Sequence, residues 1–271
     1  MIVHGMPDET YHSRPELSST GARTLLPEFK GTPAKYQYRL GREYHSTAFD
    51  LGKAVHARVL GTGAQAIAYP PDVLASNGAA STKAAKEWAD SVRAEGMVPM
   101  KAEDLRPIQA MADAVLAHPA ARTLLENAPA REVSAFADVD GVPTRCRFDA
   151  LGETTGIDLK TSARPVDPNT FSREVFEYGY HFHQEFYKDT YRASENRDID
   201  FAFIAVEKAA PHLVAVHRLD FEYEAIGKRL ANEARRIYAE CMASGEWPGH
   251  PTDIQLVSPP PWAIEHEEIT F

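Results

Sequence analysis

Two carboxylates and one lysine lie close together in the sequence on predicted strands. Asp158 and Lys160 are two residues apart on a predicted strand, 154–161, so both side chains project from one face while Leu159 points into the core. Asp149 lies on the preceding predicted strand, and a short turn would bring it beside Asp158. This pattern predicts a polar site built on two neighbouring strands.

The chemistry of these side chains indicates a metal site. Two converging carboxylates repel each other unless a cation lies between them. Hard oxygen ligands with open positions favour Mg²⁺, with Mn²⁺ able to substitute. Such an ion lowers the pKa of bound water and stabilises charge on a phosphodiester, and Lys160 would orient that water as a point charge. The alternative is a solvated strand face, because short patterns such as Asp-x-Lys are common by chance. The surrounding alternation, and the separate strand of Asp149, favour the site.

Histidines on two predicted helices are further candidates. His56 lies beside the apolar stripe of a predicted amphipathic helix, 47–61. A lone histidine in that setting is more often structural than a ligand. His183 and Tyr187 are four residues apart within a later helical stretch, 168–195, and share one face. Ordinary packing by Tyr187 is the alternative to a functional role.

The order of the expected elements predicts an α/β fold, with a mixed central sheet flanked by helices and a helical N-terminal region. Residues 62–82 read as a loop, and Asp140-Gly141 is a hairpin turn signal. We expect one domain, 1–271, made of a mainly helical region 1–126, a catalytic core 127–245 and an irregular C-terminal wrap 246–271. The predicted helices are 47–61, 83–95, 102–126, one or two in 168–195, and 221–244; the strands are 132–138, 143–151, 154–161, 199–207 and 212–219.

Composition favours a soluble, cytoplasmic protein. The 271 residues contain no apolar run near the ~20 residues of a membrane helix, and the first residues lack the pattern of a signal peptide. Cys146 and Cys241 are most simply two free thiols in a reducing compartment.

The net charge of −10 argues by itself against a nucleic-acid partner. The charge is uneven, however, and a carboxylate-built metal site would itself add negative charge. A locally basic face therefore stays compatible with the composition. Residues 21–60 carry seven basic side chains against three acidic ones, namely Arg23, Lys30, Lys35, Arg39, Arg42, Lys53 and Arg58.

As a set, these motifs resemble the PD-(D/E)xK nuclease superfamily, whose core is helix, three strands, helix, strand. Within it, the chain resembles the RecB-like branch with a helix-borne histidine, through LGKAVH, RFD and IDLKT. More closely, it resembles the nuclease of RecE-type exonucleases nearly end to end, from YHSRPELSST through YGYHFHQEFYKDTY to YAECMASGEWPGH. Each motif is weak alone.

The resemblance implies roles for individual residues. His56, Asp149 and Asp158 would hold the metal with the backbone carbonyl of Leu159, and Lys160 would be the catalytic lysine.

The resemblance also implies roles for an acidic residue and for a later helix, where this sequence follows the family pattern less closely. Glu132, at the start of the first strand, matches a recurring acidic position. The helix after the site usually carries Gln-x-x-x-Tyr, whereas here His183 is in register and Gln184 follows it. Either His183 replaces the glutamine or Gln184 serves with a shifted register. These residues, with Tyr187 and Lys53, would contact the substrate.

The resemblance also implies an activity. Similar enzymes resect one strand of linear double-stranded DNA from the 5′ to the 3′ direction, leaving a 3′ single strand for a RecT-like annealing protein. They often form homo-oligomeric rings, and the expected setting is phage or prophage recombination.

Three alternatives stay open. An endonuclease or a Cas4-like nuclease would use the same site, although two cysteines cannot hold an iron–sulfur cluster. A catalytically inactive module that only binds DNA is opposed by the presence of Asp149, Asp158 and Lys160. A hydrolase with a serine or cysteine nucleophile is opposed by the lack of a Gly-x-Ser-x-Gly motif in the sequence.

Overall fold

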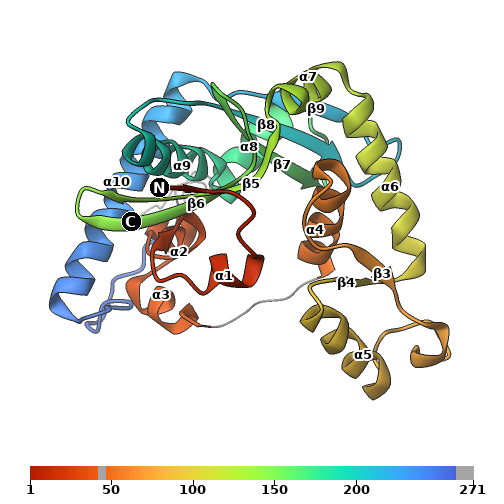
Figure 1. Cartoon of the computed structure of the whole chain (residues 1–271). Helices are drawn as coiled ribbons and strands as arrows, with labels where there is room; N and C mark the ends of the chain where they lie inside the picture. Colours follow the sequence, from red (N-terminus) through yellow and green to blue (C-terminus); the bar gives the residue numbers. More distant parts are fainter. Residues whose placement is uncertain (42–46, 261–271) are drawn as a thin grey trace, which may run out of the picture.

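A central seven-stranded sheet dominates the structure, a computed structural model that describes residues 1–41 and 47–260. Two neighbouring pairs, β2–β6 and β7–β8, are parallel and the others are antiparallel, so the sheet is mixed and mostly antiparallel (Figure 1). In spatial order its strands are β1 (Ile2–Val3), β5 (Ala130–Val139), β6 (Val142–Leu151), β7 (Thr155–Ser162), β8 (Asp200–Glu207) and β9 (Val214–His217), with β2 (Leu17–Ser18) paired to β6.

Helices pack against the sheet in two groups, each with its own apolar core. The first core is rich in aromatic side chains such as Phe148, Phe182 and Phe203, and the second is mainly aliphatic. The α/β fold with a mixed sheet flanked by helices is therefore confirmed. The first group contains α2 (Ser19–Arg23), α8 (Pro168–Tyr178), α9 (Tyr180–Glu195) and α10 (Phe221–Ser244), and the second contains α4 (Thr47–Leu60), α6 (Ala102–Ala117) and α7 (Pro119–Asn127).

Smaller elements complete the described chain. They are α1 (Asp8–His12), α3 (Pro33–Arg39), α5 (Lys83–Ala94), the 3-10 turns Pro27–Phe29 and Pro71–Val73, and a separate parallel pair, β3 (Ala66–Ala68) with β4 (Val98–Met100).

Local sequence signals explain where the core elements turn. The β5–β6 hairpin turns at Asp140 and Gly141, with φ angles of 54° and 82°, which an Asp-Gly pair adopts at low cost. Helix α8 begins at Pro168 because the Asp167 side chain accepts two backbone N–H groups of the first turn. It ends at Gly179, whose φ of 73° stops the helix before α9.

The structure corrects the predicted elements in three places. The helix expected over 102–126 is two helices, because Pro119 cannot continue α6 and instead begins α7. The expected loop 62–82 contains β3, whose partner β4 lies thirty residues later and gives no local signal. The N-terminal region, expected to be helical, also adds β1 and β2 to the central sheet.

The C-terminal stretch has no helix or strand from 246 to 260, as expected, and 261–271 lie outside the described residues. Over the described ranges, none of the helices combines the length and apolarity needed to cross a bilayer.

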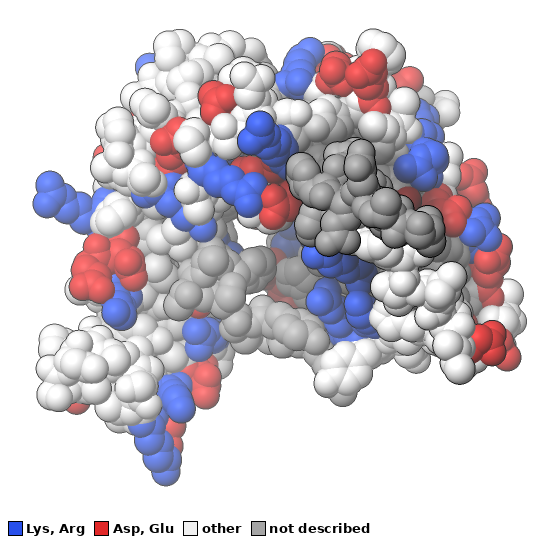
Figure 2. Space-filling view, turned by 180° about the vertical axis from the view of Figure 1, so that it is seen from behind, with Lys and Arg blue, Asp and Glu red and all other residues white. Residues whose placement is uncertain are grey.

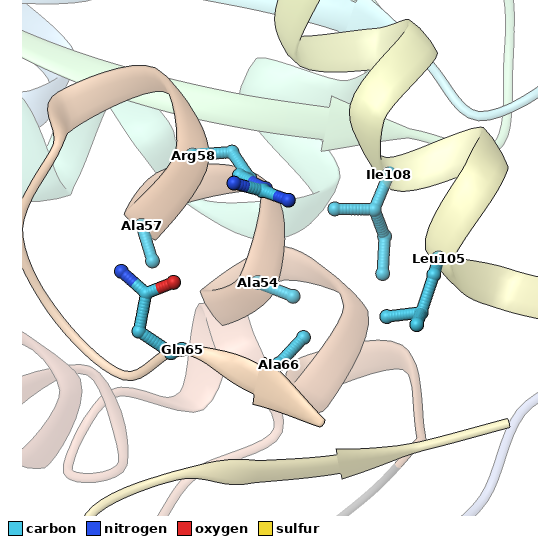
Figure 3. Close-up of a pocket in the computed structure, with 7 residues that line it drawn as sticks. All are labelled: Ala54, Ala57, Arg58, Gln65, Ala66, Leu105 and Ile108. Atoms are coloured by element: carbon cyan, nitrogen blue, oxygen red, sulfur yellow. The ribbon is translucent and has the colours of Figure 1, made fainter. Parts of the chain in front are cut away.

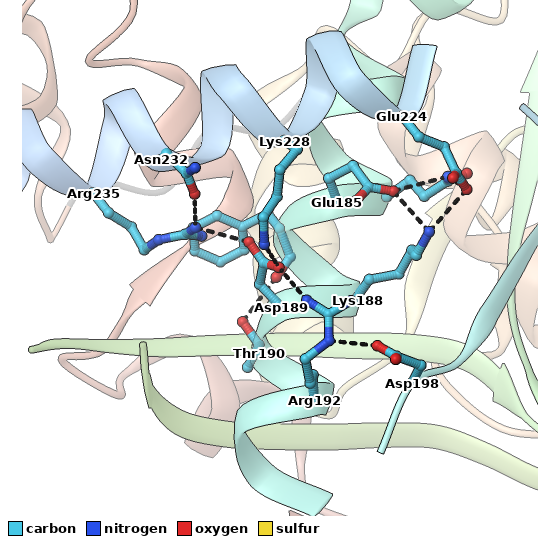
Figure 4. A network of polar contacts seen from close by, with 12 residues as sticks. Glu185, Lys188, Asp189, Thr190, Arg192, Asp198, Glu224, Lys228, Asn232 and Arg235 are labelled. Atoms are coloured by element: carbon cyan, nitrogen blue, oxygen red, sulfur yellow. Dashed lines mark hydrogen bonds and ion pairs between the residues drawn. The ribbon is translucent and has the colours of Figure 1, made fainter. Parts of the chain in front are cut away.

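A buried ionic network joins α9 to α10 (Figure 4). The Asp189 side chain is only 2% exposed and lies 2.7 Å from Arg235, which is 4% exposed. Lys228 and Arg192 also pair with the same carboxylate. Three cations therefore surround one buried acid, and their mutual geometry fixes the position of α9.

We expect Asp189→Ala to lower the free energy of unfolding by about 3–5 kcal/mol, because it leaves the buried Arg235 guanidinium uncompensated. Urea denaturation measures the change. Asp198→Ala, which breaks an exposed pair with Arg192, is the matched control and should cost at most about 1 kcal/mol. If both variants lose the same small amount of unfolding free energy, the buried network does not stabilise the fold.

Candidate active site

The site begins where β6 and β7 stop pairing. Their ladder contains only Ala150 opposite Ile157 and Leu151 opposite Gly156. Beyond these pairs the Asp149 carboxylate enters the gap, and its Oδ2 accepts the Leu159 N–H at 2.6 Å. The side chain thus replaces a strand-to-strand hydrogen bond, which holds Asp149 beside Asp158.

A glycine makes this close pairing feasible. A Cβ added to Gly156 would lie 2.6 Å from the Phe148 ring, well inside van der Waals contact. Phe148 is fully buried and immediately precedes Asp149. The small residue on β7 therefore lets the aromatic ring of β6 anchor the strand that carries the carboxylate.

Asp158 and Lys160 lie on one face of β7 and form an ion pair, as the spacing predicts. Leu159 between them is buried in the opposite core, against α4 and α6. The Lys160 ammonium also lies 4.9 Å from the centre of the Tyr180 ring, an aromatic face that favours a cation. Lys160 is thus held in place from both sides.

His56 reaches the same site from α4. Its Nδ1 lies 3.4 Å from Asp149 Oδ2, while Val55 beside it is completely buried in the helix–sheet core. The helix therefore packs across β7 as the role of His56 requires, and the imidazole stands at the rim next to the carboxylate. The structure brings His56, Asp149, Asp158 and Lys160 together.

Glu132 lies on β5, opposite Asp149 of β6 in the register of the hairpin. The β5–β6 ladder pairs Arg131 with Ala150 and Val133 with Phe148, but the intervening pair is missing. Glu132 has a φ of 49°, a left-handed conformation that is unfavourable for a glutamate. Such strain often occurs at functional sites.

The carboxyl groups of the site differ in their tendency to ionise. Burial, aided by the nearby Asp149, raises the pKa of Asp158 to about 6 and that of Glu132 to about 7. Burial also opposes ionisation of Asp149, but His56, Lys160 and the Leu159 N–H outweigh it and hold the pKa of Asp149 below its usual range. One carboxylate is therefore firmly ionised while two others titrate near neutrality.

His183 and Gln184, the two candidate polar residues of helix α9, lie in different surroundings. His183 faces the site, with Nε2 at 3.6 Å from Asp158 Oδ2 and its ring against Tyr187 at a centroid distance of 3.9 Å. Gln184 is buried on another side, where its amide donates to Glu185 and Glu224. The structure thus places His183, and not Gln184, in the position facing the carboxylates.

Two basic residues of the 21–60 stretch, Lys53 and Arg58, lie on different sides of α4. Lys53 lies one helical turn before His56 and pairs with Asp8. Arg58 instead lines a small cavity with Ala54 and Leu105 (Figure 3). Ala54 and Arg58 are each two residues from His56, a turn of about 200° around the helix, so the cavity lies on the other side of α4. That cavity is therefore separate from the carboxylates. Arg42 lies outside the described residues.

Sequence reasoning missed several contacts of the site. Ser19 Oγ lies 3.1 Å from His183 Nδ1, across 164 residues of sequence, and so fixes the orientation of the imidazole. Asp8 and Arg147 form an ion pair close to Asp149. No local pattern marks these residues, because their partners come from distant elements.

The donor set fits a hard divalent cation, although the described residues contain no preformed group of three or more His, Cys, Asp or Glu ligands. Lys160 and the Leu159 N–H occupy carboxylate oxygens of Asp158 and Asp149. Asp158 Oδ2 is paired with Lys160, whereas His183 Nε2 is buried without a hydrogen bond. The site therefore retains an unsatisfied imidazole nitrogen next to an excess of carboxylate.

Comparison with solved structures supports the fold. A crystal structure from Eubacterium rectale, described as a "putative exonuclease", matches with a TM-score of 0.63 and 12% identity, covering 98% of this chain and 100% of the other. LHK-Exo in complex with dAMP matches with a TM-score of only 0.29 and 15% identity, over 73% and 91% of the two chains, which is too low to support an argument.

Comparison of the sequence with curated proteins gives no significant match. A family model does match, over residues 23–259, and its description is "PDDEXK-like domain of unknown function (DUF3799)". The match covers most of the chain and contains all the side chains of the site that come from α4, the central strands and α9, namely His56, Glu132, Asp149, Asp158, Lys160 and His183. This protein belongs to the DUF3799 family of PDDEXK-like domains.

Proposed function

We propose that this protein is a metal-dependent DNA nuclease, an exonuclease acting on the ends of linear double-stranded DNA. The observation that carries the proposal is the convergence of Asp149, Asp158 and Lys160 on adjacent strands of a PDDEXK-like fold. A fold alone does not define an activity, so the argument rests on these side chains.

The residues of the site have distinct proposed roles. Asp149, Asp158 and His56 would hold Mg²⁺, or Mn²⁺ in its place, which when bound stabilises charge on the phosphate and lowers the pKa of a water. The Leu159 N–H points into the gap between β6 and β7, and in a strand the carbonyl of the same residue points to the same side. That carbonyl is therefore available as a further ligand.

Other side chains would act on the substrate directly. Lys160 holds an ammonium next to Asp158, where it can position water and stabilise the developing negative charge of the phosphate. Glu132, with a pKa of about 7, is suited to accept a proton at neutral pH. His183, Tyr187 and Lys53 would contact the DNA.

Finer features of the proposal rest on the resemblance to RecE-type exonucleases. They are 5′ to 3′ polarity, a 3′ single-stranded product for recombination, a RecT-like annealing partner and a homo-oligomeric ring. Lys and Arg side chains that gather in a hollow on one face support contact with a phosphate backbone despite the net charge of −10 (Figure 2).

Digestion of end-labelled linear DNA and covalently closed circles tests the function. We expect Mg²⁺-dependent degradation of the linear duplex, none with EDTA, and resistance of the circles. Lys160→Ala should lower the rate by about 10²–10³ fold while calorimetry shows that metal binding survives. Lys83→Ala, in an exposed pair, is the control. Rapid cutting of circles would favour an endonuclease, and a normal rate in Lys160→Ala would exclude that lysine.

Metal titration separates the ligands from one another. We expect His56→Ala to weaken metal binding at least about tenfold. High concentrations of Mn²⁺ should restore part of the activity, because the carboxylate ligands of the site remain in this variant. Asp158→Ala removes a charged ligand and should not recover. His4→Ala, an exposed histidine, provides the control. Wild-type metal binding in His56→Ala would make this histidine structural.

The raised pKa of Asp158 predicts a pH-dependent effect on stability without metal. Because the folded pKa of about 6 lies above the ordinary 3.8, the ionised form destabilises the fold as pH rises through this window. The free energy of unfolding of Asp158→Asn, relative to that of the wild type, should therefore increase by on the order of 2 kcal/mol as the pH rises from about 4 to about 7. Thermal melts in EDTA measure the difference, and a constant difference across pH would contradict the expectation.

A further inference from the structure

The Asp8 carboxylate bridges α4 and β6, two of the three elements that carry candidate metal ligands. Asp8 Oδ2 lies 3.2 Å from Lys53 Nζ on α4, and Asp8 Oδ1 lies 3.0 Å from Arg147 Nη1 on β6. The His12 ring is 3.4 Å from the same Oδ1. Asp8 therefore sits at a point where basic groups from three elements converge.

These cations lie next to the site. Arg147 and Asp149 are two residues apart on β6, which places them on one face about 7 Å apart. Lys53 and His56 are three residues apart on α4 and so are neighbours on the helix surface. The Asp8 carboxylate thus occupies an anion position beside the candidate metal ligands of α4 and β6, His56 and Asp149. The separation of about 7 Å between Arg147 and Asp149 is comparable with that of neighbouring phosphates in a nucleic-acid strand.

The position is preorganised but accessible. Arg147 is only 9% exposed, and its other nitrogens donate to Ser134 Oγ and to the Met6 carbonyl. The Asp8 side chain is 56% exposed. A phosphodiester resembles a carboxylate in carrying one negative charge on two oxygens, and both accept hydrogen bonds from a guanidinium and an ammonium.

The segment that carries Asp8 has other attachments. Tyr11 is buried beneath the Arg147 guanidinium, which lies 4.1 Å from the centre of its ring. Arg145 donates to the backbone carbonyls of His12 and Arg14, and β1 pairs with β5. Loss of the Asp8 charge therefore leaves α1 anchored to the sheet.

We propose that Lys53 and Arg147 form a subsite for the DNA phosphate next to the scissile one, and that Asp8 occupies it in the free protein as an internal competitor. DNA exchanges with the carboxylate when it binds. This inference rests on the proposed nuclease function, which supplies the phosphodiester substrate.

Binding of a fluorescent linear duplex, measured by anisotropy in Ca²⁺ without Mg²⁺, tests the subsite. Asp8→Asn should bind about threefold to tenfold more tightly than wild type, because the competing charge is gone. Adding Lys53→Met to Asp8→Asn should remove most of the gain.

The control is Asp198→Asn, which makes the same charge change in an exposed pair with Arg192 and should leave affinity within about twofold. If Asp8→Asn behaves like this control, or only lowers the melting temperature, Asp8 is a structural anchor and the subsite is wrong. If wild type binds duplex but Asp8→Asn does not bind it better, the subsite fails alone. Absence of DNA binding by every variant would overturn the proposed function as well.

Discussion

The electrostatic repulsion between Asp149 and Asp158 is the constraint around which the site is built. Both side chains are largely buried, where an uncompensated carboxylate is costly. Three groups offset this cost: the Lys160 ammonium, the His56 imidazole and the Leu159 N–H. The compensation is unequal, so the pKa of Asp149 falls while that of Asp158 rises to about 6. A divalent cation would complete it.

The scaffold holds these compensating groups by rigid contacts on both sides of the sheet. On one side, Leu159 and Val55 pack in the same apolar core and bring α4 to the strand. On the other, α10 approaches α9 so closely that a Cβ at Gly227 would lie 2.2 Å from the His181 carbonyl. With the buried Asp189 network, this contact fixes the helix that presents His183 to the carboxylates. The polar groups of the site are therefore oriented by packing, the preorganisation that the proposed catalysis needs.

The acidic net charge is compatible with the proposed DNA substrate because the relevant charges are local. The carboxylates of the site attract a cation, and Lys53 and Arg147 lie immediately beside them. In the free protein Asp8 pairs with these two cations. If DNA displaces Asp8 as proposed, the positive charge that it meets at this point is larger than the net charge of the protein indicates. The family match shows a PDDEXK-like domain, and the arrangement of its side chains is what connects that fold to phosphodiester cleavage.

The sequence by itself determined the period-2 strands, the Asp140-Gly141 turn and the shared face of Asp158 and Lys160, because these depend on residues that are near neighbours in the chain. It also marked His56 as a candidate from its place on a predicted helix, while its role as a metal ligand was implied only by the resemblance. Tertiary structure decided that His183, and not Gln184, faces the site, since one helical residue step turns a side chain by about 100° and packing against α10 selects the direction. It alone placed Ser19, Asp8 and Arg147 at the site, because these contacts join elements far apart in sequence and leave no local pattern.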